Sequence, residues 1–375
     1  MKRPVVPPAT IGMLGGGQLG RYAVMAARTM GFRTVVLEPD ESAPAGTVAD
    51  VHLAADYDDE AALRELAERC DVVTTEFENP PARALDVLSR RTFVAPSSRV
   101  VAIAQDRIAE KAFLVGAGVP VGRYAVVAAD DDDPDVAYPA ILKTARLGYD
   151  GKGQRPVDDP SMMRAAWTLL GGVPCVLEEA LELDTEVSAV VARNVDGDVA
   201  TYPVAENTHV DGVLDLSVVP ARIPRRLADR AVGLAMTIVD ALDYVGVLAV
   251  EFFVVDGDLL VNELAPRPHN SGHWTLDVAQ TSQFEQQIRA VCGLPLGDTS
   301  MTRPGAAMVN LLGDLWDPVE PAWAASLEGG RVALHLYGKT PPRPGRKMGH
   351  LTAWAESPEA AEIVARSARA ALLSR

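Results

Sequence analysis

The sequence contains few cysteines and no long hydrophobic segment, and each shortage excludes a class of protein. Its three cysteines, Cys70, Cys175 and Cys292, are far apart and form no CxxC pair, so neither a disulfide framework nor a zinc site is predicted. We expect buried thiols instead. Residues 1–8 contain basic residues and prolines but no apolar run long enough for a signal peptide or a membrane span. A cytoplasmic protein is therefore expected.

Positive charge is also in short supply. The chain has 35 Lys and Arg against 51 Asp and Glu, a formal charge of −16, and long-range repulsion would oppose binding to nucleic acid or to an anionic membrane. Any phosphate site must therefore be local. The densest acidic run, Asp130–Asp133, lacks the ligand spacing of a metal loop and is interpreted as a solvated turn. With 375 residues and 48% hydrophobic content, the chain can bury a large core in two or three domains.

The first third of the chain alternates between strand and helix patterns. Thr10–Leu14 is predicted to be a strand that leads through a glycine turn into a helix, and Thr34–Leu37 and Val72–Thr75 are further strands. This alternation predicts an α/β fold with a parallel, doubly wound sheet. A change of domain is expected near Pro96, and a shorter segment follows Leu296.

Residues 250–263 predict a β-hairpin whose two apolar runs flank a three-residue turn centred on Gly257. Symmetry about Gly257 gives three cross-strand pairs: Val255 with Leu259, Phe253 with Val261, and Glu251 with Glu263. Like charges opposite one another destabilise a sheet, so a shared proton, a basic neighbour or a divalent cation must compensate. Magnesium is favoured, with Asn262 alongside, because it binds a few carboxylate oxygens together with waters and phosphates. The alternative is an exposed pair splayed into solvent.

Two further segments carry groups suited to anions. Lys143 ends a predicted strand and leads into the glycines of Gly148–Gln154, which match no Walker motif but would suit a flexible flap over phosphates; a simple turn is the alternative. After the hairpin, Arg267 lies in a loop with two prolines and is suited to hold an oxyanion. In the same loop, His269 either binds substrate or caps a turn.

Two weaker patterns remain. The strand end Glu178–Leu181, with Glu186 after it, could present its backbone to an adenine and a carboxylate to a ribose, or could form surface salt bridges. Gly15–Gly20 satisfies GxGxxG, and Glu38 ends the next strand, which favours a rival hypothesis of a nicotinamide-dependent oxidoreductase. That motif alone is weak, since any phosphate can bind at a helix N-terminus.

Taken together, five segments resemble the N5-carboxyaminoimidazole ribonucleotide synthase family, over residues 11–352. They are Gly15–Arg21, Glu76–Asn79, Gly148–Gln154, Asn262–His273 and Arg343–His350. The resemblance implies an ATP-grasp fold with a Rossmann-like N-terminal domain (residues 1–98), a central ATP-grasp domain (99–297) and a small C-terminal substrate-side domain (298–375). It also implies a homodimeric, magnesium-dependent ligase of purine biosynthesis that needs no biotin. Such an enzyme uses ATP and bicarbonate to form carboxyphosphate and carboxylates the amine of 5-aminoimidazole ribonucleotide.

The resemblance also implies roles for particular residues. ATP would be bound by a group around the flap: Arg107, Lys143, Gly148, Tyr149, Asp150, Gly151, Lys152, Gly153, Gln154, Glu178, Glu179, Ala180, Leu181, Glu186, His209, Asn262 and Glu263. The ribonucleotide would be bound by Gly17, Gln18, Leu19, Glu76, His269, Lys339, Arg346 and Lys347. Magnesium would be held by Glu251 and Glu263, while Asp150, Arg267 and Lys347 would be catalytic.

Two further functional hypotheses are open besides the oxidoreductase. A formate-dependent glycinamide ribonucleotide transformylase would share the fold and the nucleotide site, but the segment Arg346–His350 speaks against it. A non-catalytic protein would bind ATP without turning it over. The oxidoreductase hypothesis leaves the Glu251 and Glu263 pair unexplained.

Overall fold

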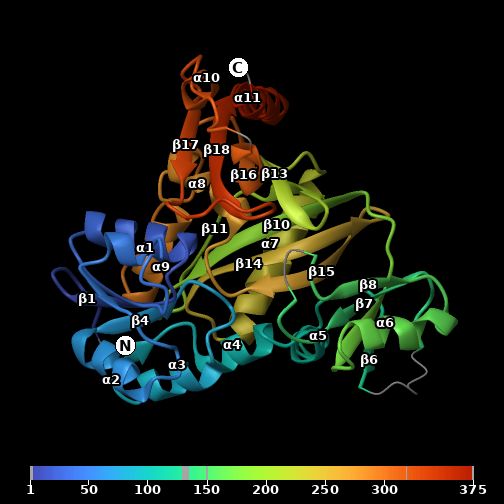
Figure 1. Cartoon of the computed structure of the whole chain (residues 1–375), viewed down its shortest axis with the longest axis horizontal. Helices are drawn as coiled ribbons and strands as arrows, with labels where there is room; N and C mark the ends of the chain where they lie inside the picture. Colours follow the sequence, from blue (N-terminus) through green and yellow to red (C-terminus); the bar gives the residue numbers. More distant parts are fainter. Residues whose placement is uncertain (1–2, 129–134, 149–150, 318, 374–375) are drawn as a thin grey trace.

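The computed structural model describes residues 3–128, 135–148, 151–317 and 319–373. The acidic turn at Asp130–Asp133 and the flap residues Tyr149 and Asp150 lie outside these ranges. Within the described part of the chain the strands form three sheets (Figure 1). No helix in these ranges is both long and apolar enough to cross a bilayer. The three cysteines are free and buried, as predicted.

The N-terminal sheet is parallel, with the order β3-β2-β1-β4-β5. Its strands are β1 (Thr10–Leu14), β2 (Arg33–Leu37), β3 (Val51–Leu53), β4 (Val72–Thr75) and β5 (Phe93–Val94). The connecting helices are α1 (Gln18–Thr29), η1 (Gly46–Val48), α2 (Glu60–Arg69) and α3 (Ala82–Ser89). All five residues of β1 are buried, as expected for a central strand covered on both faces. The predicted doubly wound α/β architecture is confirmed.

A four-stranded antiparallel sheet lies on the opposite side of the molecule (Figure 1). Two helices lead into it, α4 (Ser98–Ala104) and α5 (Arg107–Gly116). Its strands, in the order β6-β9-β7-β8, are β6 (Tyr124–Val127), β9 (Cys175–Glu179), β7 (Ala140–Thr144) and β8 (Gln154–Val157), followed in sequence after β8 by η2 (Pro160–Met162) and α6 (Met163–Leu169). The glycine-rich segment connects β7 to β8, so Lys143 and Gln154 are cross-strand partners at its base.

The largest sheet spans the middle and the C-terminal part of the chain, with β10-β12-β13-β16 at its centre. Its strands are β10 (Thr185–Arg193), β11 (Val199–Thr201), β12 (Ala205–Val210), β13 (Val213–Val219), β14 (Gly246–Val255), β15 (Asp258–Ala265), β16 (Gly305–Leu312), β17 (Val332–Leu336) and β18 (Lys347–Ala355). The helices of this region are α7 (Arg225–Ala241), η3 (Asn270–Gly272), α8 (Thr275–Val278), α9 (Gln283–Val291), η4 (Gly313–Trp316), α10 (Trp323–Ser326) and α11 (Pro358–Ala371). Because β16 pairs with β13, the C-terminal strands continue the central sheet. Domain limits at residues 98 and 297 stay a prediction.

Packing between these parts brings distant segments together. Helix α1 of the N-terminal region lies against α9, where the rings of Tyr22 and Phe284 are 5.1 Å apart. Helix α7 covers β10 and β14, and its buried Leu227, Ile238 and Val239 belong to the same core as Val250. The hairpin β14–β15 therefore has a fixed position between the N-terminal sheet and the four-stranded sheet (Figure 1).

Candidate active site

The hairpin β14–β15 places Glu251 opposite Glu263, as predicted, but by a different register. The turn has two residues, Asp256 and Gly257, both with positive φ (51° and 73°), which is the geometry of a tight hairpin turn. The strands therefore pair as Val255 with Asp258, Val254 with Leu259, Phe253 with Leu260, and Phe252 with Val261. The predicted pairs of Val255 with Leu259 and Phe253 with Val261 are wrong. A bulge then leaves Asn262 without a cross-strand partner and returns the two glutamates to register.

The two glutamates and the bulged asparagine form an oxygen-rich site. Glu251 lies 3.0 Å from Nε2 of His269, and Glu263 lies 3.3 Å from Nη2 of Arg107. Burial opposes ionisation of Glu251, but the hydrogen bond and charge of His269, with His209 and Lys347, lower its pKa to about 2. The side-chain oxygen of Asn262 is buried without a hydrogen-bond partner. Two carboxylates beside an unsatisfied amide oxygen are a donor set that suits magnesium.

Lys143 lies in a buried cluster of charges with a second lysine that sequence reasoning missed. Glu178 is 3.0 Å from Lys143 and 3.5 Å from Lys111, and Lys111 also donates to the backbone carbonyl of Asn262 at 3.5 Å. Burial disfavours the charge on Glu178, but the two lysines lower its pKa. Burial also lowers the pKa of Lys111, which is 1% exposed. Lys111 therefore links the strand carrying Glu178 to the hairpin that carries Glu263.

A buried glutamate next to Lys111, Glu110, also bonds to strand β15 of the hairpin. Glu110 accepts a hydrogen bond from the backbone N–H of Leu264 at 2.7 Å, directly after Glu263. Burial, reinforced by the charge of Glu263, raises the pKa of Glu110 to about 8, although Arg107 opposes the shift. Arg107 and Lys111 lie four residues apart on α5, and this helical spacing was the available signal for Lys111.

The glycine flap approaches a tight turn of the large sheet. Gly151 and Gly153 have φ of +75° and +72°, and a Cβ on Gly151 would lie 3.2 Å from the backbone oxygen of Asp211 in the turn between β12 and β13. The amide of Thr144 donates to the carbonyl of Gly153 at 2.8 Å, which ties the end of the flap to the strand of Lys143. Gly148, Lys152 and Gln154 lie on the same segment.

Beyond the flap, the predicted ribose and adenine contacts lie at neighbouring strand ends. Glu186 is 3.0 Å from Nδ1 of His209; burial opposes charge on His209, but Glu186 raises its pKa. The amides of Glu179 and Ala180 already donate to the carbonyls of Arg123 and Pro139, so these two N–H groups have protein partners. Leu181 follows directly, and its side chain would lie 3.6 Å from a Cβ on Gly122.

Arg267 is held by a residue of the N-terminal region that sequence reasoning did not single out. Its Nε donates to Glu78, while Nη1 donates to the carbonyl of Pro268 at 3.1 Å. Burial opposes charge on both partners, yet their ion pair lowers the pKa of Glu78 and raises the pKa of Arg267. No signal in the sequence linked Glu78 to Arg267, because the two lie 189 residues apart in the chain.

Carboxylates occupy the glycine turn before α1. Glu76 accepts from the amides of Gly17 and Gly20 at 2.8 and 3.0 Å, and Glu38 accepts from Gly16 at 2.8 Å. Burial raises the pKa of Glu76, and the amides of Gly20 and Gly17, together with the charges of Arg267 and Lys339, oppose the shift. Leu19 points into the core, 7% exposed, whereas Gln18 at the start of α1 is half-buried.

The basic residues of the C-terminal part face this turn and the hairpin. Lys339 donates to the carbonyl of Lys347 at 3.1 Å, and its charge acts on Glu76. Arg346 donates to the carbonyls at 340 and 341, both at 3.1 Å, and Lys347 begins β18. The charge of Lys347 acts on Glu251 and on His209. The structure thus brings the basic residues predicted to bind ATP and those predicted to bind the ribonucleotide toward one region of the molecule.

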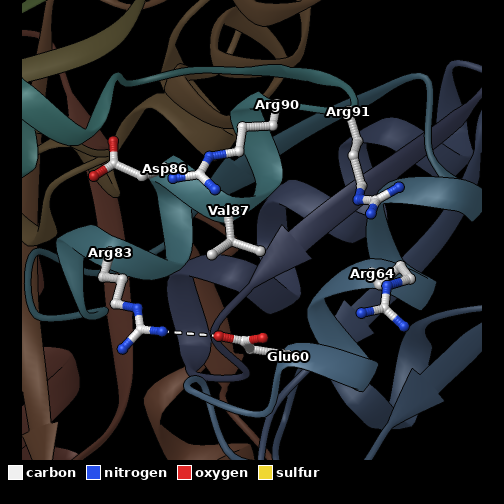
Figure 2. A pocket seen from close by; sticks show the side chains of 7 residues that line it. All are labelled: Glu60, Arg64, Arg83, Asp86, Val87, Arg90 and Arg91. Carbon is white, nitrogen blue, oxygen red and sulfur yellow. Dashed lines mark hydrogen bonds and ion pairs between the residues drawn. The ribbon is translucent and has the colours of Figure 1, made fainter.

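A separate hollow of about 490 Å³ lies on the N-terminal region, between α2 and α3 (Figure 2). It is lined by Glu60, Arg64, Arg83, Asp86, Val87, Arg90 and Arg91. Arg83 pairs with Glu60 at 2.8 Å, and both side chains are largely exposed, which makes this ion pair worth about 0–1 kcal/mol. None of the predicted site residues lines this hollow, so it is not part of the candidate active site.

Comparison with known proteins matches this arrangement. Three family profiles cover the chain: "Ribonucleotide synthetase preATP-grasp domain" at residues 8–105, "ATP-grasp domain" at 112–284, and "Phosphoribosylaminoimidazole carboxylase C-terminal domain" at 306–363. The N5-carboxyaminoimidazole ribonucleotide synthase of Bacillus subtilis is 45% identical over 356 residues, which are 94% of this chain and 93% of the relative. The chain belongs to the N5-carboxyaminoimidazole ribonucleotide synthase family.

Solved structures of this synthase family share the whole fold. The ADP complex of one N5-carboxyaminoimidazole ribonucleotide synthetase superposes with a TM-score of 0.91 at 41% identity, covering 98% of both chains. The synthase of Aspergillus clavatus in complex with ADP and 5-aminoimidazole ribonucleotide gives a TM-score of 0.87 at 29% identity, covering 97% of this chain and 98% of that one. The predicted ATP-grasp fold with its N-terminal and C-terminal parts is therefore confirmed.

Proposed function

We propose that this synthase-family chain is an ATP-dependent ligase that carboxylates the amine of 5-aminoimidazole ribonucleotide to N5-carboxyaminoimidazole ribonucleotide, in purine biosynthesis. Membership of the synthase family supports the reaction. The observation that carries the proposal is the meeting of two cationic groups at one hairpin: Lys143 and Arg107 on one side, and Arg267 with Lys347 on the other. One group suits the phosphates of ATP, and the other suits a small anion and a ribonucleotide.

We assign the metal to Glu251 and Glu263, with Asn262 beside them, because the donor set is all oxygen. Bound there, magnesium would supply positive charge to the phosphate oxygens. Lys143 and Arg107 would hold the β- and γ-phosphates in line for attack by bicarbonate, a positioning and electrostatic task. Arg267, kept rigid by Glu78, would hold bicarbonate in its planar fork. Attack on the γ-phosphorus would release ADP and form carboxyphosphate.

The second half-reaction uses the other face of the site. The amine of the ribonucleotide would attack the carboxyl carbon of carboxyphosphate, phosphate would leave, and the amine would lose a proton. Lys347 and Asp150 would bind the aminoimidazole and manage that proton. Lys339, Arg346 and Gln18 after the glycine turn would hold the ribonucleotide, with Glu76 near it. Carboxyphosphate hydrolyses readily, so closure of the segment Gly148–Gln154 would exclude water.

The adenine would lie along the strand end Glu178–Leu181, with Glu186 on the ribose and His209 beside it. We also propose a cytoplasmic homodimer, on the family resemblance, with no biotin.

The deciding experiment measures ADP release by the purified chain with ATP, magnesium and bicarbonate, with and without 5-aminoimidazole ribonucleotide. Strong, bicarbonate-dependent stimulation by the ribonucleotide is expected. Stimulation by formate and glycinamide ribonucleotide instead would overturn the substrate, and no ATP turnover under any combination would favour a non-catalytic protein.

A further inference from the structure

A second group of side chains suited to a metal ion involves neither glutamate of the hairpin. Asp277 on α8, His335 on β17 and His350 on β18 present ligand atoms that all lie within 4.8 Å of one another. Figure 1 shows α8 beside β17. Strand register explains the histidine pair, because His335 and His350 are direct cross-strand partners, with ring centroids 4.5 Å apart. The group contains no cysteine, so the wide spacing of the cysteines has no bearing on it.

The closest contact in this group has the spacing of two ligands on one zinc ion. Nε2 of His335 lies 2.9 and 3.1 Å from the two carboxylate oxygens of Asp277. Zinc binds imidazole nitrogen and carboxylate oxygen at about 2.0–2.2 Å, so two such ligands lie about 2.9–3.4 Å apart at angles between about 90° and 109°. Without a metal the same two groups form an ordinary hydrogen bond, so a further observation is needed.

The buried ring of His350 supplies that observation. His350 is 0% exposed, and its Nδ1 lies 2.9 Å from the hydroxyl of Tyr337. Its Nε2 is buried as well but has no hydrogen-bond partner among the described residues. Buried polar atoms nearly always have a partner, so an unsatisfied one indicates a missing ion or water. Because Nδ1 can donate to the oxygen of Tyr337, Nε2 can carry the lone pair that a metal needs.

The surroundings of the group suit an ion that enters from one side. The side chains of His335 and Asp277 are 21% and 17% exposed, which leaves an entry path and room for a water ligand. On the buried side, the rings of Tyr22 and Tyr337 have centroids 6.3 and 5.7 Å from that of His350. These rings restrict His350, so His335 and Asp277 must supply most of the approach to it, at most about 1.5 Å for a tetrahedral site.

We propose that Asp277, His335 and His350 bind a zinc ion, with water as the fourth ligand. Two histidines and one carboxylate are a ligand set that zinc uses in proteins, whereas magnesium prefers oxygen ligands. The ion ties α8, within the region matched by the ATP-grasp profile, to β17 and β18, within the region matched by the C-terminal profile. This site is separate from the magnesium site of the proposed function and does not depend on that reaction.

Zinc binding by the purified full chain, measured by competition with a coloured chelator, tests the site. The measurements use the Glu251→Gln background, which removes one carboxylate of the hairpin, and contain no nucleotide. One zinc ion per chain is expected there, and adding His335→Gln should abolish its binding. The matched control adds His52→Gln instead. His52 is also half-buried, but it lies on β3 of the N-terminal sheet, and its Nε2 is 2.9 Å from the carbonyl of Glu38.

Two graded variants separate a ligand from its outer partner. Asp277→Asn keeps the shape of the side chain but removes the charged ligand, and Tyr337→Phe removes only the hydroxyl that contacts His350. Loss of an outer partner lowers metal affinity by about 10- to 100-fold, so Tyr337→Phe should weaken zinc binding by that factor and Asp277→Asn by at least as much. Circular dichroism verifies that each variant is folded before its affinity is compared with that of the control.

A measurement on the wild-type chain covers the case in which a substitution prevents folding. In crystals grown with zinc, anomalous scattering at the zinc absorption edge locates the ion without any variant. The expected position is between the carboxylate of Asp277 and the imidazoles of His335 and His350. Nε2 of His350 should then lie about 2.0–2.1 Å from the ion.

Three results would overturn the proposal: no zinc binding, equal binding in the variants with His335→Gln and His52→Gln, or an ion found only at the hairpin. Each would mean that a buried water, rather than a metal, satisfies Nε2 of His350. Zinc binding is measured without ATP or ribonucleotide. Failure of the carboxylation assay would therefore overturn the proposed function and leave the zinc site standing, and the reverse outcome is equally distinguishable.

Discussion

Replacing Lys143 with methionine tests whether its ammonium acts on ATP or only on the protein. The side chain lies 3.0 Å from Glu178, which also has Lys111 at 3.5 Å. A hydrogen bond to a charged group contributes about 1.5–3 kcal/mol, and each 1.36 kcal/mol is a factor of ten. If Lys143 holds a phosphate oxygen in the transition state, Lys143→Met should lower kcat/KM for ATP by roughly 10- to 150-fold.

Stability should change for a different reason. Glu178 is 6% exposed, and losing one of its two cations should cost about 1–3 kcal/mol of the free energy of unfolding. The double variant Lys143→Met, Glu178→Gln also takes away the anionic partner of Lys111, which is 1% exposed, so urea denaturation should show no recovery of that loss. ATP turnover should stay low in both variants. A wild-type kcat/KM in the single variant, or recovery of turnover in the double variant, would refute a direct role in ATP binding.

Three further predictions concern the hairpin and its surroundings. Glu263→Gln should abolish most magnesium-dependent ADP release while the protein stays folded, as circular dichroism would verify. Lys347→Ala should leave ATP cleavage largely intact but uncouple it from carboxylation, seen as a rise in ADP formed per carboxylated product; a normal ratio contradicts that role. Glu110 should make stability pH-dependent: its folded-state pKa of about 8 lies above that of an unfolded glutamate, so the folded state retains a proton that the unfolded chain releases. Stability should therefore fall as pH rises from about 4.5 to 8, and Glu110→Gln, which keeps an acceptor for Leu264, should flatten the fall in urea midpoints; an unchanged slope contradicts it.

The sequence predicted the pairing of Glu251 with Glu263 correctly, but only because a wrong turn length and an unpredicted bulge cancel each other. Counting outward from Gly257 assumed a three-residue turn, whereas Asp256 and Gly257 form a two-residue turn. That change shifts the register by one residue and would turn the side chains to opposite faces. The bulge at Asn262 inserts one residue and cancels the shift. Turn type and bulge are both decided by backbone conformation, which hydrophobic alternation does not encode.

Contacts between distant segments were also beyond the sequence. The parallel sheet followed from the alternation of strands and helices, because that pattern is local. The partners of Arg267 and Glu178 come from Glu78 and Lys111, 189 and 67 residues away in the chain, and no spacing rule links them. Buried charges of this kind are recognisable only after packing shows that no water reaches them.

The glycine turn before α1 shows how a sequence motif can be satisfied without its usual ligand. A nicotinamide-dependent enzyme would direct the turn amides at a pyrophosphate and use Glu38 for a ribose. Here the amides of Gly16, Gly17 and Gly20 donate to Glu38 and Glu76, so two carboxylates already occupy the positive end of the helix. A dinucleotide would have to displace both. The same occupation constrains the proposed function: a ribonucleotide bound near this turn must use groups other than these three amides. Gln18, at the start of α1, and the cations Lys339 and Arg346 are then the contacts to test first.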